Sequence, residues 1–170
     1  DEKWIIENVR KACDLAVKYG NTHIRAFADV DSKARLEGVK GVIEREERNI
    51  RTAGYSGSCI PTGRCCKRTR CKELIKEALD LGADVVGGIP WIEFTEEEEL
   101  DHVNSMCDYA KEYNKDISML LDDVGDAEER TLEMLCKKVI EMDGREELRH
   151  SIAVQWNCIL KITSESWFLF

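Results

Sequence analysis

Short apolar segments alternate with amphipathic helical segments along this chain of 170 residues. Apolar runs at residues 23–30, 84–91 and 117–121 predict buried strands. Three- and four-residue spacing of apolar side chains predicts helices over residues 2–19, 33–49 and 72–81, from Thr95 onward, and over 127–142. Strands that alternate with helices of this length need crossover connections, so the predicted fold class is α/β with a parallel sheet.

The spacing of the strands indicates one more strand than the residues themselves do. The predicted strands begin near residues 23, 84 and 117, so the second interval is 33 residues and the first, 61 residues, is nearly twice as long. A strand is therefore expected near residue 54. The segment 51–71 shows no apolar alternation and carries four clustered cysteines, Cys59, Cys65, Cys66 and Cys71. We expect about four strand–helix units, with this one disrupted.

Composition and charge narrow the class of protein. The chain has 43% hydrophobic residues and 2 prolines, which is typical of a single globular domain over residues 1–170. A formal charge of -9 argues against a nucleic-acid partner, because neutralising phosphates with Lys and Arg is the main source of that affinity. No apolar run is long enough for a membrane-spanning helix and no leader is visible, so the expected location is cytoplasmic.

Three segments resemble the cytosine-deaminase-like branch of the metal-dependent amidohydrolase superfamily. They are NTHIRAFADVD (21–31), ELIKEALDLGADVVGGIPWIEFT (73–95) and KDISMLLDDVGDAEERTLEML (115–135), and their order and spacing match that family. The match covers residues 1–50 and 72–143. The resemblance implies a partial (β/α)8 (TIM) barrel from a hydrolase that acts on non-peptide C–N bonds of a small cyclic amidine or amide. It also implies a divalent metal, Zn or Fe, as the cofactor of the parent family.

The resemblance also implies roles for individual residues. Asp123 takes the position of a proton-shuttling glutamate, and Asp122 precedes it as a second catalytic candidate. The implied substrate-binding residues are His23, Arg25, Asp29 and Trp91.

Ordinary structural roles compete with these assignments. Two acidic residues before a helix, here Asp122 and Asp123, also favour its positive end. Polar residues near a strand end, such as His23 and Arg25, also occur simply paired with neighbours. On the acidic helix that follows Thr95, we expect His102 to be exposed, whereas Met106 and Cys107 are predicted to lie in the core. The sequence does not decide between the catalytic and capping roles of Asp122 and Asp123, or between the substrate-binding and structural roles of His23 and Arg25.

The metal ligands of the family are not found in this chain. Leucines, Leu120 and Leu121, stand where close deaminases have a metal histidine and a cysteine, and Phe27 and Trp91 stand where they have histidines. The three histidines of the chain are too few for a hydrolytic metal centre of this kind. The resemblance would place the remaining ligands before residue 1 and after residue 170. We therefore assign no metal ligand, and expect this chain to bind no metal and to lack deaminase activity.

Reading-frame shifts are our hypothesis for the two anomalous segments, 51–71 and 147–170. Codons for residues 56–72 can be chosen so that a shifted frame reads QVAAFPQDGVVKEPGA, which resembles the missing strand of the family. Codons from residue 147 onward can likewise read RVTSQHSRAV, which resembles the next strand and its metal-binding histidine. Our hypothesis is that the frame is lost near residue 50, regained near Lys72, and lost again after about residue 145.

A Cys-rich zinc-binding or interaction module at residues 59–71 is the alternative interpretation. Four thiolates can hold zinc, and basic neighbours would lower the pKa of each thiol. The spacing C-x5-C-C-x4-C does not match the paired C-x2-C of zinc ribbons. The basic residues of the segment RCCKRTRCK (64–72) would form only a weak nucleic-acid patch, because no aromatic residues are interleaved with them.

Overall fold

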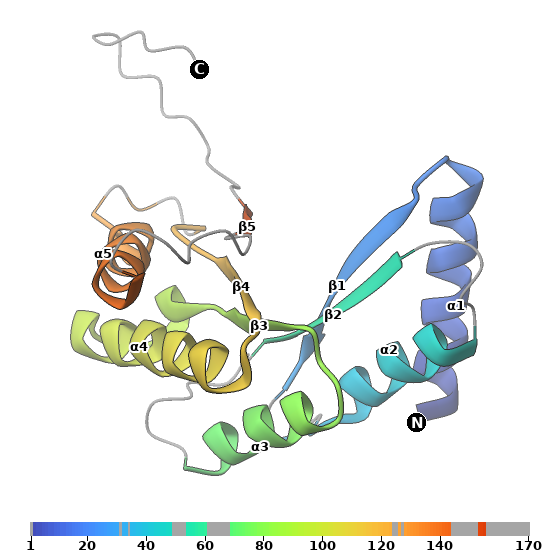
Figure 1. The fold of residues 1–170 in the computed structure, drawn as a ribbon, viewed down its shortest axis with the longest axis horizontal. Helices are drawn as coiled ribbons and strands as arrows, with labels where there is room; N and C mark the ends of the chain where they lie inside the picture. The colour runs from blue at the N-terminus through green and yellow to red at the C-terminus, as the bar shows by residue number, and fades with distance from the viewer. Residues whose placement is uncertain are drawn as a thin grey trace, which may run out of the picture.

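The structure is a computed structural model that describes residues 2–30, 32–33, 35–48, 54–60, 69–123, 126, 128–143 and 153–155. Helices and strands alternate along the chain, with one 3-10 turn (Figure 1). In chain order they are α1 (Glu2–Lys18), β1 (His23–Asp29), α2 (Glu37–Arg48), β2 (Gly54–Ile60), α3 (Thr69–Asp80), β3 (Val85–Gly88), η1 (Pro90–Ile92), α4 (Glu96–Tyr113), β4 (Asp116–Leu120), α5 (Thr131–Asp143) and β5 (Ala153–Gln155). None of the described helices is both long and apolar enough to cross a bilayer.

The strands form one parallel sheet in which spatial order follows chain order, β1-β2-β3-β4-β5. Right-handed crossovers between consecutive parallel strands send every connecting helix to the same face of the sheet. The helices accordingly follow one another around one side of it, from α1 through α3 to α5 (Figure 1). The predicted α/β class with a parallel sheet is confirmed. In the described part of the chain, the five strands do not close into a barrel.

The core lies between that face of the sheet and the helices. Alternate strand residues, Ala28, Val86 and Met119, are buried in one hydrophobic cluster. The helices contribute most of the other buried side chains, among them Val39, Val42, Leu74, Ile75, Ala78, Val103, Met106, Cys107, Ala110, Met134, Leu135 and Val139. Met106 and Cys107 are fully buried, as their spacing predicted. The intervening strand residues, such as Arg25 and Asp29, therefore lie on the opposite face.

Strand β2 forms where the spacing required a strand, although its residues lack strand alternation. Its backbone pairs with β1 from His23↔Gly54 to Asp29↔Ile60, and it also pairs with β3. Ladder hydrogen bonds use backbone groups, which every residue of this proline-free segment supplies. The four predicted strand–helix units are thus present, and the expectation that the unit at 51–71 is disrupted is corrected, because β2 pairs with both of its neighbours. Strand β5 adds a fifth strand within the segment 147–170.

Three predicted boundaries differ from the structure for local reasons. Helix α2 begins at Glu37 rather than residue 33, because Arg35 has a left-handed backbone with φ 52 that a helix cannot include. Strand β3 ends at Gly88 rather than residue 91, since Pro90 has no N–H to donate to a ladder. Helix α5 begins at Thr131, where Asp122 caps it, rather than at residue 127.

The crossing of α1 and α2 gives a testable pair of glycines. A Cβ on Gly41 would lie 2.6 Å from Ile5 Cγ2, whereas one on Gly38 would meet nothing closer than 3.6 Å. We expect Gly41→Ala to lower the free energy of unfolding by about 1–3 kcal/mol through overpacking. Gly38→Ala should instead raise it by up to about 1 kcal/mol, because alanine is the better helix former. Urea denaturation of both variants checks this, and equal effects would contradict the close crossing.

Candidate functional site

The carboxyl ends of the parallel strands meet at one edge of the sheet, where ligand sites of parallel α/β proteins usually form. Strand β1 ends at Asp29, and β3 ends just before the turn η1, which holds Trp91. Strand β4 ends at Leu120, so Asp122 and Asp123 follow at the same edge. The fold therefore brings these four candidate residues to one end of the sheet.

His23 and Arg25 lie elsewhere on β1. His23 is the first residue of the strand, and Asp29 is the last. Six residue steps at about 3.3 Å each separate their Cα atoms by about 20 Å. His23 is exposed, and its Nδ1 lies 3.3 Å from Thr22 Oγ1. Arg25 is the third residue of the strand, on the same sheet face as Asp29, so it lies nearer to the edge than His23 does.

Asp122 caps helix α5. Its Oδ1 accepts hydrogen bonds from Thr131 Oγ1 at 2.7 Å and from the Leu132 backbone N–H at 3.2 Å. Its own N–H donates to Thr131 Oγ1 at 3.1 Å. A φ of 51 at Asp122 turns the chain so that both contacts form. The capping alternative raised by the sequence therefore accounts for the Asp122 contacts, and Asp123, partly exposed, is the next side chain at the edge.

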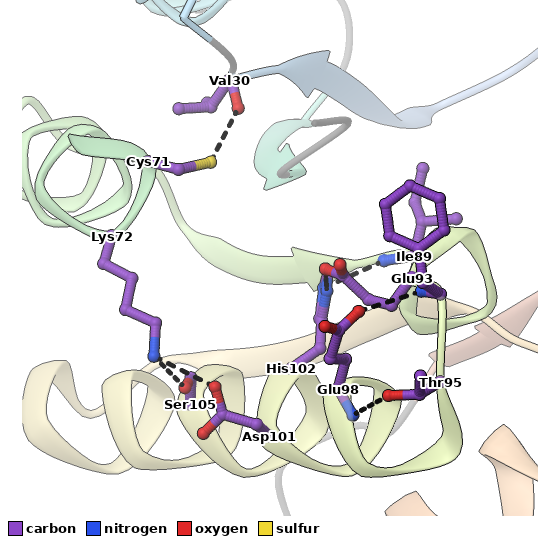
Figure 2. A network of polar contacts seen from close by, with 11 residues as sticks. Val30, Cys71, Lys72, Ile89, Glu93, Thr95, Glu98, Asp101, His102 and Ser105 are labelled. Carbon is purple, nitrogen blue, oxygen red and sulfur yellow. Dashed lines mark hydrogen bonds and ion pairs between the residues drawn. The ribbon is translucent and has the colours of Figure 1, made fainter. Parts of the chain in front are cut away.

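A buried histidine–glutamate pair supports the same edge, and the sequence analysis missed it (Figure 2). The expectation that His102 is exposed is wrong: its side chain is 0% exposed and that of Glu93 is 1% exposed. The Ile89 N–H donates to His102 Nε2 at 3.3 Å. Because Nε2 accepts, Nδ1 carries the proton and donates to Glu93 Oε1 at 2.9 Å.

Glycine at position 88 lets the imidazole approach β3. A Cβ there would lie 3.1 Å from His102 Nε2 and 3.3 Å from Met119 Sδ. The signal for a buried His102 was available in the sequence, because His102 is four residues before Met106, which was predicted to lie in the core. The run of glutamates before it concealed that spacing.

The helix α4 begins with a capping box (Figure 2). Thr95 Oγ1 accepts from the Glu98 N–H at 3.3 Å. The Glu98 carboxylate in turn accepts from the Phe94 N–H at 3.1 Å. These bonds fix the chain between η1 and α4, directly after Trp91. The indole Nε1 of Trp91 is itself buried, with no hydrogen-bond partner in the part of the chain that the structure describes.

The cysteine cluster is only partly within the described residues. Cys71 is buried on α3, and its Sγ lies 3.9 Å from the Val30 carbonyl oxygen. Cys59 belongs to β2, where its backbone pairs with Ala28 and Val86. Cys65 and Cys66 lie outside the described residues. The zinc-module alternative therefore stays a prediction.

An acidic cavity of about 230 Å³ lies where the start of α4 meets the segment before α5. It is lined mainly by carboxylates, from Glu96, Glu99, Asp126, Glu128 and Glu129. Burial, reinforced by the neighbouring Glu129 carboxylate, raises the pKa of Glu99 to about 7. Glu99 therefore holds its proton in the folded chain at pH values where an unfolded chain has lost it.

This pKa predicts how Glu99 affects stability. With the folded pKa above the ordinary 4.5, the favourable contribution of Glu99 is fully present below pH 4.5 and is lost as the pH rises to about 7. We expect Glu99→Gln to raise the free energy of unfolding by about 1–2 kcal/mol near pH 8, after discounting for solvent screening, and to have no effect below pH 4.5. Thermal unfolding against pH measures this. Glu97→Gln, on the exposed side of the same turn, is the control, and an identical pH profile for both would contradict it.

The described residues do not fit a metal site by themselves. Among them, no three His, Cys, Asp or Glu side chains are close enough to hold an ion together. Both imidazole nitrogens of His102 are already engaged, and His23 is at the opposite end of the sheet. At the edge itself, β4 ends in leucine, which cannot bind a metal.

Comparison with known proteins gives relatives in sequence and in fold, although no family model matches the chain. The chain is 28% identical over 143 residues to N-isopropylammelide isopropyl amidohydrolase of Pseudomonas sp. strain ADP, covering 81% of this chain and 34% of the relative.

Solved structures with a similar fold include enzymes of two kinds, deaminases and aminohydrolases. The chain matches 5-methylcytosine deaminase from Klebsiella pneumoniae liganded with phosphonocytosine at TM-score 0.77 and 23% identity, over 81% of this chain and 33% of that one. It matches the same enzyme liganded with 5-fluorocytosine at TM-score 0.79 and 22% identity, over 84% of this chain and 34% of that one. N-isopropylammelide isopropylaminohydrolase from Burkholderia multivorans matches at TM-score 0.66 and 24% identity, over 74% of this chain and 32% of that one.

The chain spans about a third of the length of these relatives. Sequence and fold agree on the kind of protein it resembles. The resemblance is therefore confirmed for a fragment: over about a third of their length, the chain is similar to the cytosine-deaminase-like members of the amidohydrolase superfamily.

Proposed function

We propose that this chain is a fragment of a metal-dependent amidohydrolase that hydrolyses a non-peptide C–N bond of a small cyclic amidine or amide in the cytoplasm. The observation that carries the proposal is the similarity, in sequence and fold, to proteins named for hydrolysis of such bonds. The five sequentially ordered strands are proposed to be one part of a (β/α)8 barrel, since helices along a single face are what a barrel requires.

The proposed site lies at the carboxyl edge of the sheet. Asp123 is the general acid–base candidate: its carboxylate would take a proton from the attacking water and return it to the departing nitrogen. Asp122, held by Thr131 and Leu132, would keep Asp123 in place. Arg25, Asp29 and Trp91 would contact the substrate, whereas His23 is too far along β1 to join them.

The metal of the family does not belong to the described residues of this chain, because they lack the necessary group of ligands. When bound in an intact parent, the metal would supply the activation of water. We therefore propose that the chain alone does not hydrolyse the C–N bond. Hydrolysis would need the remaining two thirds of a parent protein.

Amine release tests the proposal. We would compare this chain with a longer version in which the frame is corrected and the flanking segments are restored. With cytosine, 5-methylcytosine and N-isopropylammelide as substrates, we expect ammonia or isopropylamine only from the longer protein. Asp123→Asn should remove that activity, whereas Asp116→Asn, at the amino end of the same strand, should retain it. A longer protein that hydrolyses no C–N bond, or an active Asp123→Asn variant, would refute the proposal.

A further inference from the structure

The turn that carries Trp91 is held at both of its ends by one side chain. Ile89 stands immediately before η1 and Glu93 immediately after it. The imidazole of His102, from α4, accepts from the first and donates to the second, at 3.3 and 2.9 Å (Figure 2). We call this arrangement of Ile89, Glu93 and His102 the clasp.

The clasp is dry, and both ring nitrogens of His102 have hydrogen-bond partners. His102 is 0% exposed, and the Glu93 side chain is 1% exposed, so water does not compete for their hydrogen bonds. The two nitrogens of the ring have different partners, one a backbone donor and one a carboxylate acceptor, which fixes both the tautomer and the orientation of the ring. The turn also contains its own short bond, from the Glu93 N–H to the Pro90 carbonyl at 3.0 Å.

Trp91 is placed by this turn. Its indole nitrogen is buried, without a hydrogen bond to any described residue, so the ring has no polar tether of its own there. We propose that His102 is a positioning residue: through the clasp it fixes the η1 turn, and thereby the Trp91 ring, at the carboxyl edge of the sheet. The inference rests on the proposed function only in treating Trp91 as a wall of the substrate site.

The experiment uses the whole chain, uniformly labelled with ¹⁵N. The indole N–H resonance of Trp91 is identified by its loss in Trp91→Phe, and exchange of the Ile89 amide is followed in parallel. The double variant His102→Leu, Glu93→Leu removes the clasp together with its buried charge, which keeps the chain folded. We expect the Ile89 amide to exchange about tenfold faster, as for one lost hydrogen bond, and the Trp91 resonance to shift or broaden.

Two further variants separate positioning from general stability. Met106→Ala, at a fully buried site on the same helix, should destabilise the chain but leave the Trp91 resonance unchanged. Gly88→Ala, whose Cβ would lie 3.1 Å from His102 Nε2, should disturb the clasp while both partners remain, and should move the Trp91 resonance.

Two results would overturn the inference. The first is an unchanged Trp91 resonance and unchanged Ile89 exchange in the double variant or in Gly88→Ala. The second is an equal shift of the resonance in Met106→Ala. Neither readout involves turnover, so a failure of the proposed hydrolase activity would leave the clasp intact, and a failure of the clasp would leave that activity to be tested separately.

Discussion

Replacement of His102 by leucine is expected to lower the free energy of unfolding by about 3–5 kcal/mol, because it removes the imidazole that donates a hydrogen bond to a buried carboxylate. The Glu93 side chain is 1% exposed, so water cannot replace the imidazole as a hydrogen-bond donor. The substitution also removes the acceptor of the Ile89 N–H. Urea denaturation, followed by circular dichroism, measures the loss.

A second substitution and a surface ion pair serve as controls. Adding Glu93→Leu should recover most of the stability, since an apolar pair of suitable size replaces the buried carboxylate and its imidazole donor at little net cost. Lys76→Met breaks the exposed pair of Lys76 and Glu112, whose atoms are also 2.9 Å apart, and should leave the free energy of unfolding almost unchanged. If His102→Leu lowers the free energy of unfolding no more than Lys76→Met does, the contact between His102 and Glu93 does not stabilise the fold as its burial indicates.

Met119→Ala is expected to cost about 2–5 kcal/mol of stability, through lost burial and the cavity that remains. Met119 is fully buried in β4 and belongs to the cluster between the sheet and the helices. Ile140→Ala, on α5, is the control, because its side chain is 71% exposed and its loss should change stability by no more than about 0.5 kcal/mol. Equal effects of the two substitutions would contradict the position of the core.

The spacing of strands was a better guide to the fold than the residues of any one strand. The period required a strand near residue 54, and β2 begins at Gly54, although its residues give no such signal. Backbone pairing with β1 along seven residues explains why, since it needs only the N–H and C=O groups.

The site was harder to predict than the fold. The sequence left Asp122 open between catalysis and capping, because the choice depends on Thr131, nine residues later, and on a left-handed backbone at Asp122. It grouped His23 with Asp29, but the length of β1 separates them. His102 was masked by the charged residues around it, and its partner Glu93 lies nine residues earlier, before helix α4 begins. Local composition cannot report such contacts.

The central claim, that this chain is a fragment of a metal-dependent C–N hydrolase, is tested most directly by resequencing the DNA that encodes it together with its flanks. We predict one-base corrections near codons 50, 72 and 145 that restore family-like strands. Upstream sequence should supply a His-x-His pair of metal ligands, which the resemblance places before residue 1, and downstream sequence should supply the remaining ligands. A frame that stands as given, with flanks that contain neither, would contradict the account.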